Sequence, residues 1–187
     1  MQTFIKKISI FLIIWICFSI NLQAEVDIWK EIDKGNKIIF IRHALAPGSG
    51  DPPGFNINDC KTQRNLNDTG IKQSKKIGKL FKDNQVKIDL VLTSEWCRCK
   101  DTARYAFNNF KEFSALNSTF EAPFNKNKAK QTKEIKLFVK KWKGEGKNLI
   151  FVTHYSVITE MTTAYPSSGE IIVTDKEFQV KGSLEIN

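Results

Sequence analysis

The chain contains two histidines, and each one follows a short run of apolar residues. Residues 38–41 are followed by Arg42 and His43, and residues 149–152 are followed by Thr153 and His154. Short runs rich in Ile, Val and Phe are typical of buried strands in a parallel sheet. Because open α/β sheets build their sites at the carboxyl ends of such strands, we expect both imidazoles at one edge of one sheet. Imidazole serves as acid, base, nucleophile or metal ligand, so this placement predicts a two-histidine active site.

Several other polar residues are positioned to join this site. A guanidinium presents a planar fork of donors that matches a phosphoryl group, and Arg42 stands beside the first histidine. Arg98 falls in the first turn of an expected helix, where the partial positive charge of the helix also favours an anion. Arg64 and Ser94, which ends a predicted strand, are further candidates for binding the substrate. A surface ion pair is the structural alternative for Arg98, and for Arg64 the alternative is a place in the loop without contact to a substrate.

The amino-terminal segment has the pattern of a signal peptide. A pair of lysines precedes an apolar stretch from Ile8 to Ile20, and Ala24 supplies a small residue for cleavage. The apolar stretch is short for a membrane-spanning helix. We therefore predict that residues 1–24 are removed, and that residues 25–187 form one domain in the periplasm or outside the cell. An uncleaved membrane anchor is the alternative.

The chain is basic, with a formal net charge of +9 at pH 7. Such a surface suits anionic substrates, nucleic acid or a membrane. Many of the lysines fall in helical stretches, however, where they indicate a solvated face. No nucleic-acid-binding motif accompanies them, so we predict no nucleic-acid partner, and a membrane contact only if the amino-terminal segment is retained.

The expected mature part contains Cys60, Cys97 and Cys99. An exported protein can hold a disulfide, and Cys60 could pair with either of the other two. The rival interpretation is a metal site that uses both histidines. The Cys-x-Cys spacing differs from that of structural zinc ligands, so we predict neither a metal nor a cofactor.

Strand and helix patterns alternate along the chain. A long loop over residues 44–67 leaves the first strand and is expected to form a wall or lid of the site. The alternation predicts an α/β fold, a three-layer α/β/α sandwich with a mostly parallel central sheet. Strands are expected at residues 37–41, 89–93, 113–116, 148–153, 171–174 and 178–181, and helices at 28–34, 67–82, 96–110, about 135–142 and 156–164.

The order of three motifs resembles the histidine phosphatase superfamily, in the branch of phosphoglycerate mutases and small bacterial phosphohistidine phosphatases. The motifs are Arg42-His43 after the first strand, Ser94-x3-Arg98-x3-Thr-Ala after a middle strand, and Thr-His154 near the last third. The resemblance runs from about residue 37 to residue 174.

Two further segments strengthen the resemblance. Residues 66–74 are similar to the family segment Leu-Thr-x2-Gly-x2-Gln-Ala. The loop with Asp51 and Cys60, together with Trp96-Cys97-Arg98-Cys99, looks like an exported bacterial subgroup of that family.

The resemblance implies a fold like that of phosphoglycerate mutase and a role for each site residue. His43 would carry a transient phosphoryl group, and Arg42, Arg98 and His154 would bind the phosphate and stabilise its charge. Water would then hydrolyse the phosphohistidine without a metal. The implied partner is a phosphorylated small molecule or a phosphoprotein.

The chain departs from the family pattern at three places. Ala44 and Tyr155 stand where glycines are frequent. No acid lies in residues 116–119, where many members carry a glutamate that protonates the leaving group. Glu121 is the nearest candidate proton donor, and Glu95 is a weaker one. Without that acid, alkyl phosphates would react slowest, and aryl phosphates, phosphoramidates or anhydrides would suffer less.

The sequence therefore favours a metal-independent phosphatase, a phosphoric monoester hydrolase that acts through a phosphohistidine on His43. A catalytically weak or inactive phosphatase-like protein that binds a phosphorylated or polyanionic ligand is the main alternative. A mutase and a metal-dependent hydrolase are further hypotheses.

Overall fold

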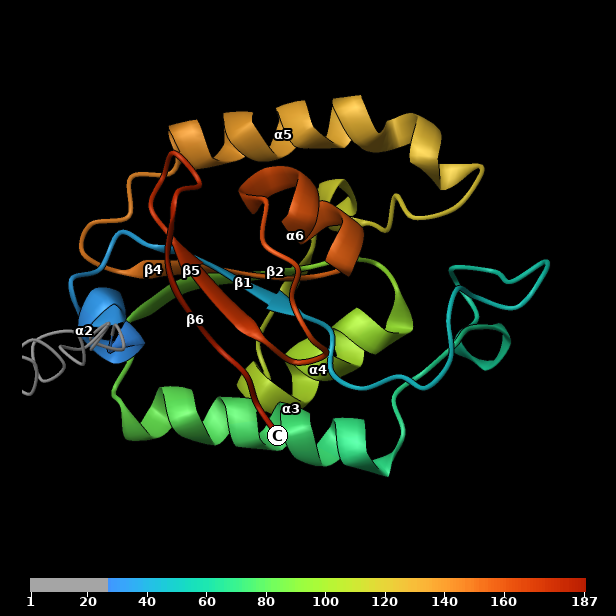
Figure 1. Ribbon diagram of the computed structural model, residues 1–187, viewed down its shortest axis with the longest axis horizontal. Helices are drawn as coiled ribbons and strands as arrows, with labels where there is room; N and C mark the ends of the chain where they lie inside the picture. Colours follow the sequence, from blue (N-terminus) through green and yellow to red (C-terminus); the bar gives the residue numbers. More distant parts are fainter. Residues whose placement is uncertain (1–26) are drawn as a thin grey trace, which may run out of the picture.

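A six-stranded sheet runs through residues 27–187, the part of the chain that this computed structural model describes (Figure 1). The strand order is β3-β2-β4-β1-β5-β6, with β3, β2, β4 and β1 parallel and β5 antiparallel to both of its neighbours. The predicted signal peptide, residues 1–24, lies outside the described residues. The strands are β1 (Ile38–Arg42), β2 (Ile88–Thr93), β3 (Lys111–Glu112), β4 (Asn148–Thr153), β5 (Ile171–Thr174) and β6 (Val180–Leu184).

Helices cover both faces of this sheet, which confirms the three-layer α/β/α sandwich with a mostly parallel sheet. The helices α3 and α4 lie together on one face, and α5 and α6 lie on the other (Figure 1). Within residues 27–187 no helix has the length and apolar character needed to cross a membrane. The helices are α2 (Ile28–Asp33), α3 (Asp68–Asp83), α4 (Cys97–Phe107), α5 (Lys128–Lys141) and α6 (Tyr155–Thr162), with short 3-10 turns η1 (Cys60–Thr62), η2 (Ser114–Leu116) and η3 (Phe124–Asn127).

Strand β1 lies in the middle of the sheet and is buried on both faces. Ile39 and Ile41 pack into the core layer on the side of α3 and α4, whereas Ile38 and Phe40 pack into the layer on the side of α5 and α6. Side chains alternate between the two faces of a strand, so a strand covered on both sides must be apolar at every position. This requirement explains the continuous apolar run of residues 38–41.

The segment predicted as a strand at residues 113–116 is instead a 3-10 turn, and the prediction was wrong there. The strand in this region, β3, covers only Lys111–Glu112 and pairs with the end of β2. Ala115 and Leu116 are apolar because they are buried, while the carbonyl of Leu116 accepts a hydrogen bond from Thr153 Oγ1 at 2.6 Å. A buried 3-10 turn therefore has the same run of apolar residues as a buried strand.

The last strand begins at Val180, two residues later than predicted. Asp175 forms a turn in which its Oδ1 accepts from the backbone N–H groups of Glu177 and Gln179. Phe178 has a positive φ of 65°, outside the extended region, so its apolar side chain belongs to the turn. Local side-chain hydrogen bonding of this kind competes with strand pairing.

The close packing of α3 on α4 depends on Gly78, because a Cβ there would overlap the carbonyl oxygen of Ala106. We expect Gly78→Ala to destabilise the protein by about 1 kcal/mol. The helix-propensity gain of about 1 kcal/mol is outweighed by overpacking against a backbone atom, which costs about 1–3 kcal/mol. Urea denaturation measures the change, with exposed Lys72→Ala on the same helix as the control. An increase in stability would contradict the proposed contact.

Candidate active site

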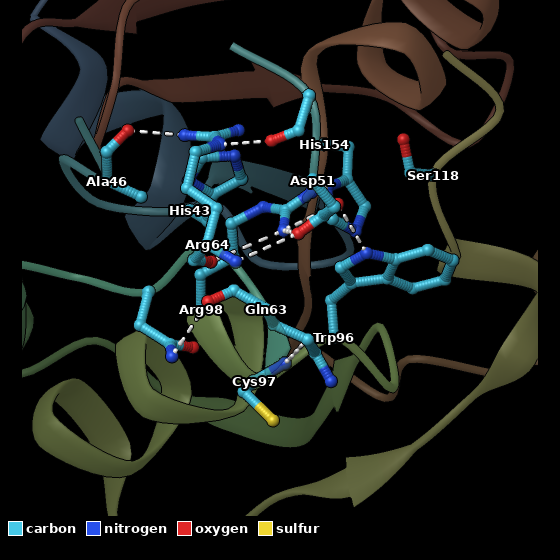
Figure 2. Close-up of polar contacts among 12 residues, drawn as sticks. His43, Ala46, Asp51, Gln63, Arg64, Trp96, Cys97, Arg98, Ser118 and His154 are labelled. Atoms are coloured by element: carbon cyan, nitrogen blue, oxygen red, sulfur yellow. Dashed lines mark hydrogen bonds and ion pairs between the residues drawn. The ribbon is translucent and has the colours of Figure 1, made fainter. Parts of the chain in front are cut away.

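The two histidines lie side by side at the carboxyl ends of adjacent parallel strands. The pairing of β1 with β4 sets Arg42 opposite Thr153, so His43 and His154 leave the sheet together. Their ring centroids are 5.5 Å apart, and each side chain belongs to a residue only 3% exposed (Figure 2). The register of two strands therefore brings together residues that are far apart in the sequence.

A cavity of about 160 Å³ opens at this edge of the sheet. Both histidines line it, together with the predicted binding residues Arg42, Arg64 and Arg98. The loop that follows β1 supplies part of the wall, as its length predicted. The cavity walls thus combine Arg42 at the end of β1, the histidines that follow β1 and β4, the start of α4 and the long loop.

His43 has its protonation pattern fixed by the backbone. Its Nδ1 lies 2.9 Å from the carbonyl oxygen of Ala44, which can only accept, so Nδ1 carries the hydrogen. Burial, followed by the positive charge of Arg98, lowers the pKa of His43 well below its usual value. The neutral ring therefore keeps a lone pair on Nε2 at physiological pH.

His154 lies between a guanidinium and a hydroxyl. Its Nδ1 is 3.4 Å from Arg98 Nη2, a donor, and its Nε2 is 2.8 Å from Ser94 Oγ. Since arginine cannot accept, Nδ1 accepts and Nε2 carries the hydrogen. Burial, and then the charge of Arg98, lowers the pKa of His154 well below its usual value. Both ring nitrogens are therefore engaged, and His154 Nδ1 becomes a donor only when the ring is protonated.

A buried ion pair holds Arg98. Its Nη1 donates to both oxygens of Asp51, at 2.8 and 3.1 Å, and the side chains are 3% and 7% exposed. Trp96 Nε1 and the backbone N–H of Arg64 also donate to this carboxylate, at 2.9 and 3.1 Å (Figure 2). Burial favours a higher pKa for Asp51, but these hydrogen bonds and the charge of Arg98 outweigh it and lower the pKa. Asp51 is therefore ionised.

The long loop is tied to the start of α4 at further points. A disulfide joins Cys60 to Cys97, so of the two pairings left open by the sequence the structure has this one. The side-chain oxygen of Gln63 accepts from the backbone N–H of Cys97 at 3.0 Å. Arg64 folds back on the loop, where its Nε donates to the carbonyl of Gly50 at 2.6 Å. These ties fix the wall that the loop contributes.

The third cysteine remains a buried thiol. Cys99 is 0% exposed, and its Sγ lies 3.4 Å from His154 Nε2. Burial raises its pKa to about 12. Nowhere in residues 27–187 do three or more His, Cys, Asp or Glu side chains gather as a candidate metal site.

Two donors in the cavity walls have no partner in the described part of the chain. The Nε atoms of Arg42 and Arg98 are buried and lack a hydrogen bond. Arg42 Nη1 donates to the carbonyl of Pro166 at 2.9 Å, which holds the guanidinium at the cavity. A buried donor left unpaired costs free energy, so these two atoms lower the stability of the folded protein locally.

The remaining predicted site residues take different positions. Ser94 lies behind His154, where it accepts from that ring, and is not part of the cavity wall. Glu121 does line the cavity, next to Gly50 of the long loop. Glu95 pairs with the side-chain amide of Asn117.

Sequence reasoning missed two residues of the site, Asp51 and Trp96. Asp51 stands in a segment rich in Gly and Pro, and Trp96 sits directly before α4. The available signal was an acid in a long loop leaving the first strand, but its arginine partner is 47 residues away. Trp96, which also donates to Asp51, is 45 residues away from it, and no local pattern indicates this contact.

The chain belongs to the histidine phosphatase superfamily, branch 1, whose family model matches residues 38–135, more than half of the chain. The fold is that of phosphoglycerate mutase-like proteins. The structure of phosphoglycerate mutase from Thermus thermophilus aligns with a TM-score of 0.55 and 13% identity, over 81% of this chain and 99% of that chain.

Proteins named SixA have the same fold. The one from Agrobacterium tumefaciens, named as a putative phosphohistidine phosphatase, aligns with a TM-score of 0.55 and 19% identity, over 81% of this chain and 99% of that chain. A protein histidine phosphatase SixA complexed with tungstate aligns with a TM-score of 0.53 and 14% identity, over 79% of this chain and 96% of that chain. No curated protein sequence matches the chain.

The Arg98–Asp51 pair makes a testable contribution to stability. We expect Asp51→Ala to lower the free energy of unfolding by about 3–5 kcal/mol, because it leaves a buried guanidinium without its counter-charge. The exposed pair Lys79–Asp83 is the matched control, and Asp83→Ala should cost at most about 1 kcal/mol. Equal losses in the two variants, measured by urea denaturation, would refute the importance of burial.

Both histidines should make stability depend on pH. As the pH falls below about 6.5 the unfolded chain binds protons at the histidines, but the folded protein does not, because both folded pKa values are lowered. Stability should therefore fall between about pH 6.5 and pH 5, by up to about 1.4 kcal/mol per pH unit for each histidine.

The chain has two histidines, so a double variant, His43→Gln with His154→Gln, removes this titration completely. Urea denaturation at several pH values gives the slope for each protein. The double variant should be nearly flat over this range, and an unchanged slope would rule out the histidines as its source.

Proposed function

We propose that this protein is a metal-independent phosphatase that hydrolyses a phosphorylated substrate through a phosphohistidine on His43. The single observation that carries the proposal is that Arg42, Arg64 and Arg98 line the same cavity as the neutral His43 ring, whose Nε2 keeps its lone pair. Guanidinium groups that share a cavity with a nucleophilic nitrogen suit a phosphoryl group. The substrate class is a phosphorylated small molecule or a phosphoprotein.

The charge of the cavity supports this assignment. Arg42, Arg64 and Arg98 line it as cations, and Asp51 is the carboxylate that pairs with Arg98. With both histidines neutral, the local balance remains positive and favours a phosphoryl dianion. For His154 Nδ1 to donate to a phosphoryl oxygen, the bound dianion must favour the protonated ring, and Arg98 Nη2 must turn from Nδ1 toward the phosphoryl group.

The proposed reaction has two displacement steps. In the first, His43 Nε2 attacks phosphorus, and the N–P bond forms while the bond to the leaving oxygen breaks. Arg42 and Arg98 stabilise the charge on the equatorial phosphoryl oxygens. In the second step water attacks phosphorus, the N–P bond breaks, and inorganic phosphate leaves with His43 restored to its neutral form.

The proton for the leaving oxygen needs a separate source. Asp51 is unsuited to supply it, because Arg98 and other donors lower its pKa and keep it ionised. Glu121 lines the cavity and is our candidate: it would give a proton to the leaving oxygen and regain one from the attacking water. An aryl oxide or an imidazole leaves with less need of this proton.

Structural neighbours agree with a site for a tetrahedral oxyanion, since one neighbour was solved with tungstate and another is a phosphoglycerate mutase. The disulfide agrees with our proposal that the protein works in the periplasm or outside the cell, where such bonds persist.

The proposal is tested by hydrolysis of 4-nitrophenyl phosphate in the presence of a chelator. We expect His43→Ala to reduce kcat/KM by at least about a thousandfold, because the nucleophile is lost. Tyr105→Ala, an exposed change on α4 away from the cavity, is the control and should retain full activity. Thermal unfolding verifies that each variant is folded.

A second measurement tests the intermediate itself. Rapid quenching with radiolabelled substrate should trap an acid-labile, base-stable phosphoryl group on wild type and none on His43→Ala. Equal turnover by wild type and His43→Ala would overturn the proposal. Thermal stabilisation by phosphate without turnover of any phosphorylated compound would instead favour a protein that only binds such ligands.

A further inference from the structure

Aromatic side chains continue the cavity outward from the histidines. The cationic and imidazole groups form its buried end, where His43, His154 and Arg98 are each 3% exposed. Phe120 and Tyr155 line the same cavity but are 60% and 38% exposed, so they stand at its mouth. The cavity therefore changes from charged to aromatic between its closed and open ends.

One wall of the cavity is a cluster of three aromatic residues, Phe55, Trp96 and Phe124. The Trp96 ring lies 5.4 Å from the His154 ring and 5.0 Å from Phe124, between ring centroids. Phe55 lies 5.7 Å from both Trp96 and Phe124. The indole is held in place by its hydrogen bond to Asp51, so this wall has a fixed position.

Tyr155, which directly follows His154, also lines the cavity. The Arg42 guanidinium lies 5.5 Å from the centre of its ring, within the range of a cation–π contact. The same arginine supplies one of the unpartnered Nε donors. A group attached to a phosphoryl held at Arg42 would therefore lie close to this ring.

We infer that the outer half of the cavity is a binding subsite for a planar aromatic group joined to the phosphoryl through oxygen or nitrogen. This inference rests on the function proposed above and adds the class of substrate. A flat ring in the outer half of the cavity would cover Phe120 and Tyr155, which line it and are exposed, and paired aromatic rings gain energy beyond the burial of their area. An alkyl or sugar phosphate would leave the same rings in contact with water.

The chemistry of the leaving group points the same way. Asp51 is held by Arg98, Trp96 and the backbone of Arg64, which leaves Glu121 as the acid among the described residues that line the cavity. A leaving group that departs with little protonation, such as an aryl oxide, reduces the demand on that acid.

Phosphonates test the subsite because they bind without reacting, so the ease of leaving does not enter the result. Dissociation constants of methyl-, cyclohexyl- and phenylphosphonate are measured by calorimetry for wild type, Phe120→Ala and Tyr105→Ala. Tyr105 is also an exposed aromatic residue, but it packs near Lys75 and lies outside the cavity.

We expect wild type and Tyr105→Ala to bind phenylphosphonate about tenfold more tightly than methylphosphonate, with cyclohexylphosphonate in between. Phe120→Ala should lose most of the preference for the phenyl compound while its affinity for methylphosphonate stays the same.

Two results would overturn the inference. Equal affinities of wild type for methyl- and phenylphosphonate, or for cyclohexyl- and phenylphosphonate, would contradict the aromatic subsite but not the proposed phosphatase activity. Failure of wild type to bind any phosphonate or inorganic phosphate would contradict both the subsite and the proposed function.

Discussion

The cost of burying the Arg98 guanidinium constrains the whole site. A charged side chain that is 3% exposed needs a counter-charge and hydrogen-bond acceptors within reach. Asp51 supplies both, and it comes from the long loop that the Cys60–Cys97 disulfide also ties to α4. The pair therefore does two things at once. It keeps the Arg98 guanidinium buried at the cavity, and it pins the loop that forms part of the cavity wall. The further hydrogen bonds from Trp96 and Arg64 to the same carboxylate extend this one contact into a network.

The sheet sets the positions of the two histidines. Parallel pairing of β1 with β4 brings two strand ends to the same level, so each imidazole reaches the cavity from a rigid support. Local contacts then set the state of each ring: a backbone carbonyl at His43, and an arginine and a serine at His154. The two histidines are chemically distinct for this reason, although they follow nearly equivalent strands. Catalytic groups placed on regular elements and oriented by neighbouring hydrogen bonds are generally better positioned than groups on free loops.

The sequence predicted what depends on local pattern. The apolar runs at residues 38–41 and 149–152 identified the central strands, because a buried strand needs consecutive apolar residues. The histidines were located by their positions just after these runs. The pairing of Asp51 with Arg98 was missed because it is a contact between a loop and a helix with no periodic signal. The choice of Cys97 over Cys99 as the partner of Cys60 depends on which side of the first turn of α4 faces the loop. Residues 113–116 were assigned to a strand because packing of a 3-10 turn produces the same apolar run.

The buried Cys99 has a consequence for the integrity of the crosslink between Cys60 and Cys97. A protein with an odd thiol beside a disulfide is ordinarily open to exchange, in which a thiolate attacks one sulfur and the bond migrates. Here the thiol stands two positions from Cys97 in the same helix, yet burial holds its pKa at about 12 and keeps it protonated at any pH the cell provides. The attacking species is thus almost absent, and solvent oxidants have no access to the sulfur. The interior that shields the histidines from water also prevents the crosslink from scrambling.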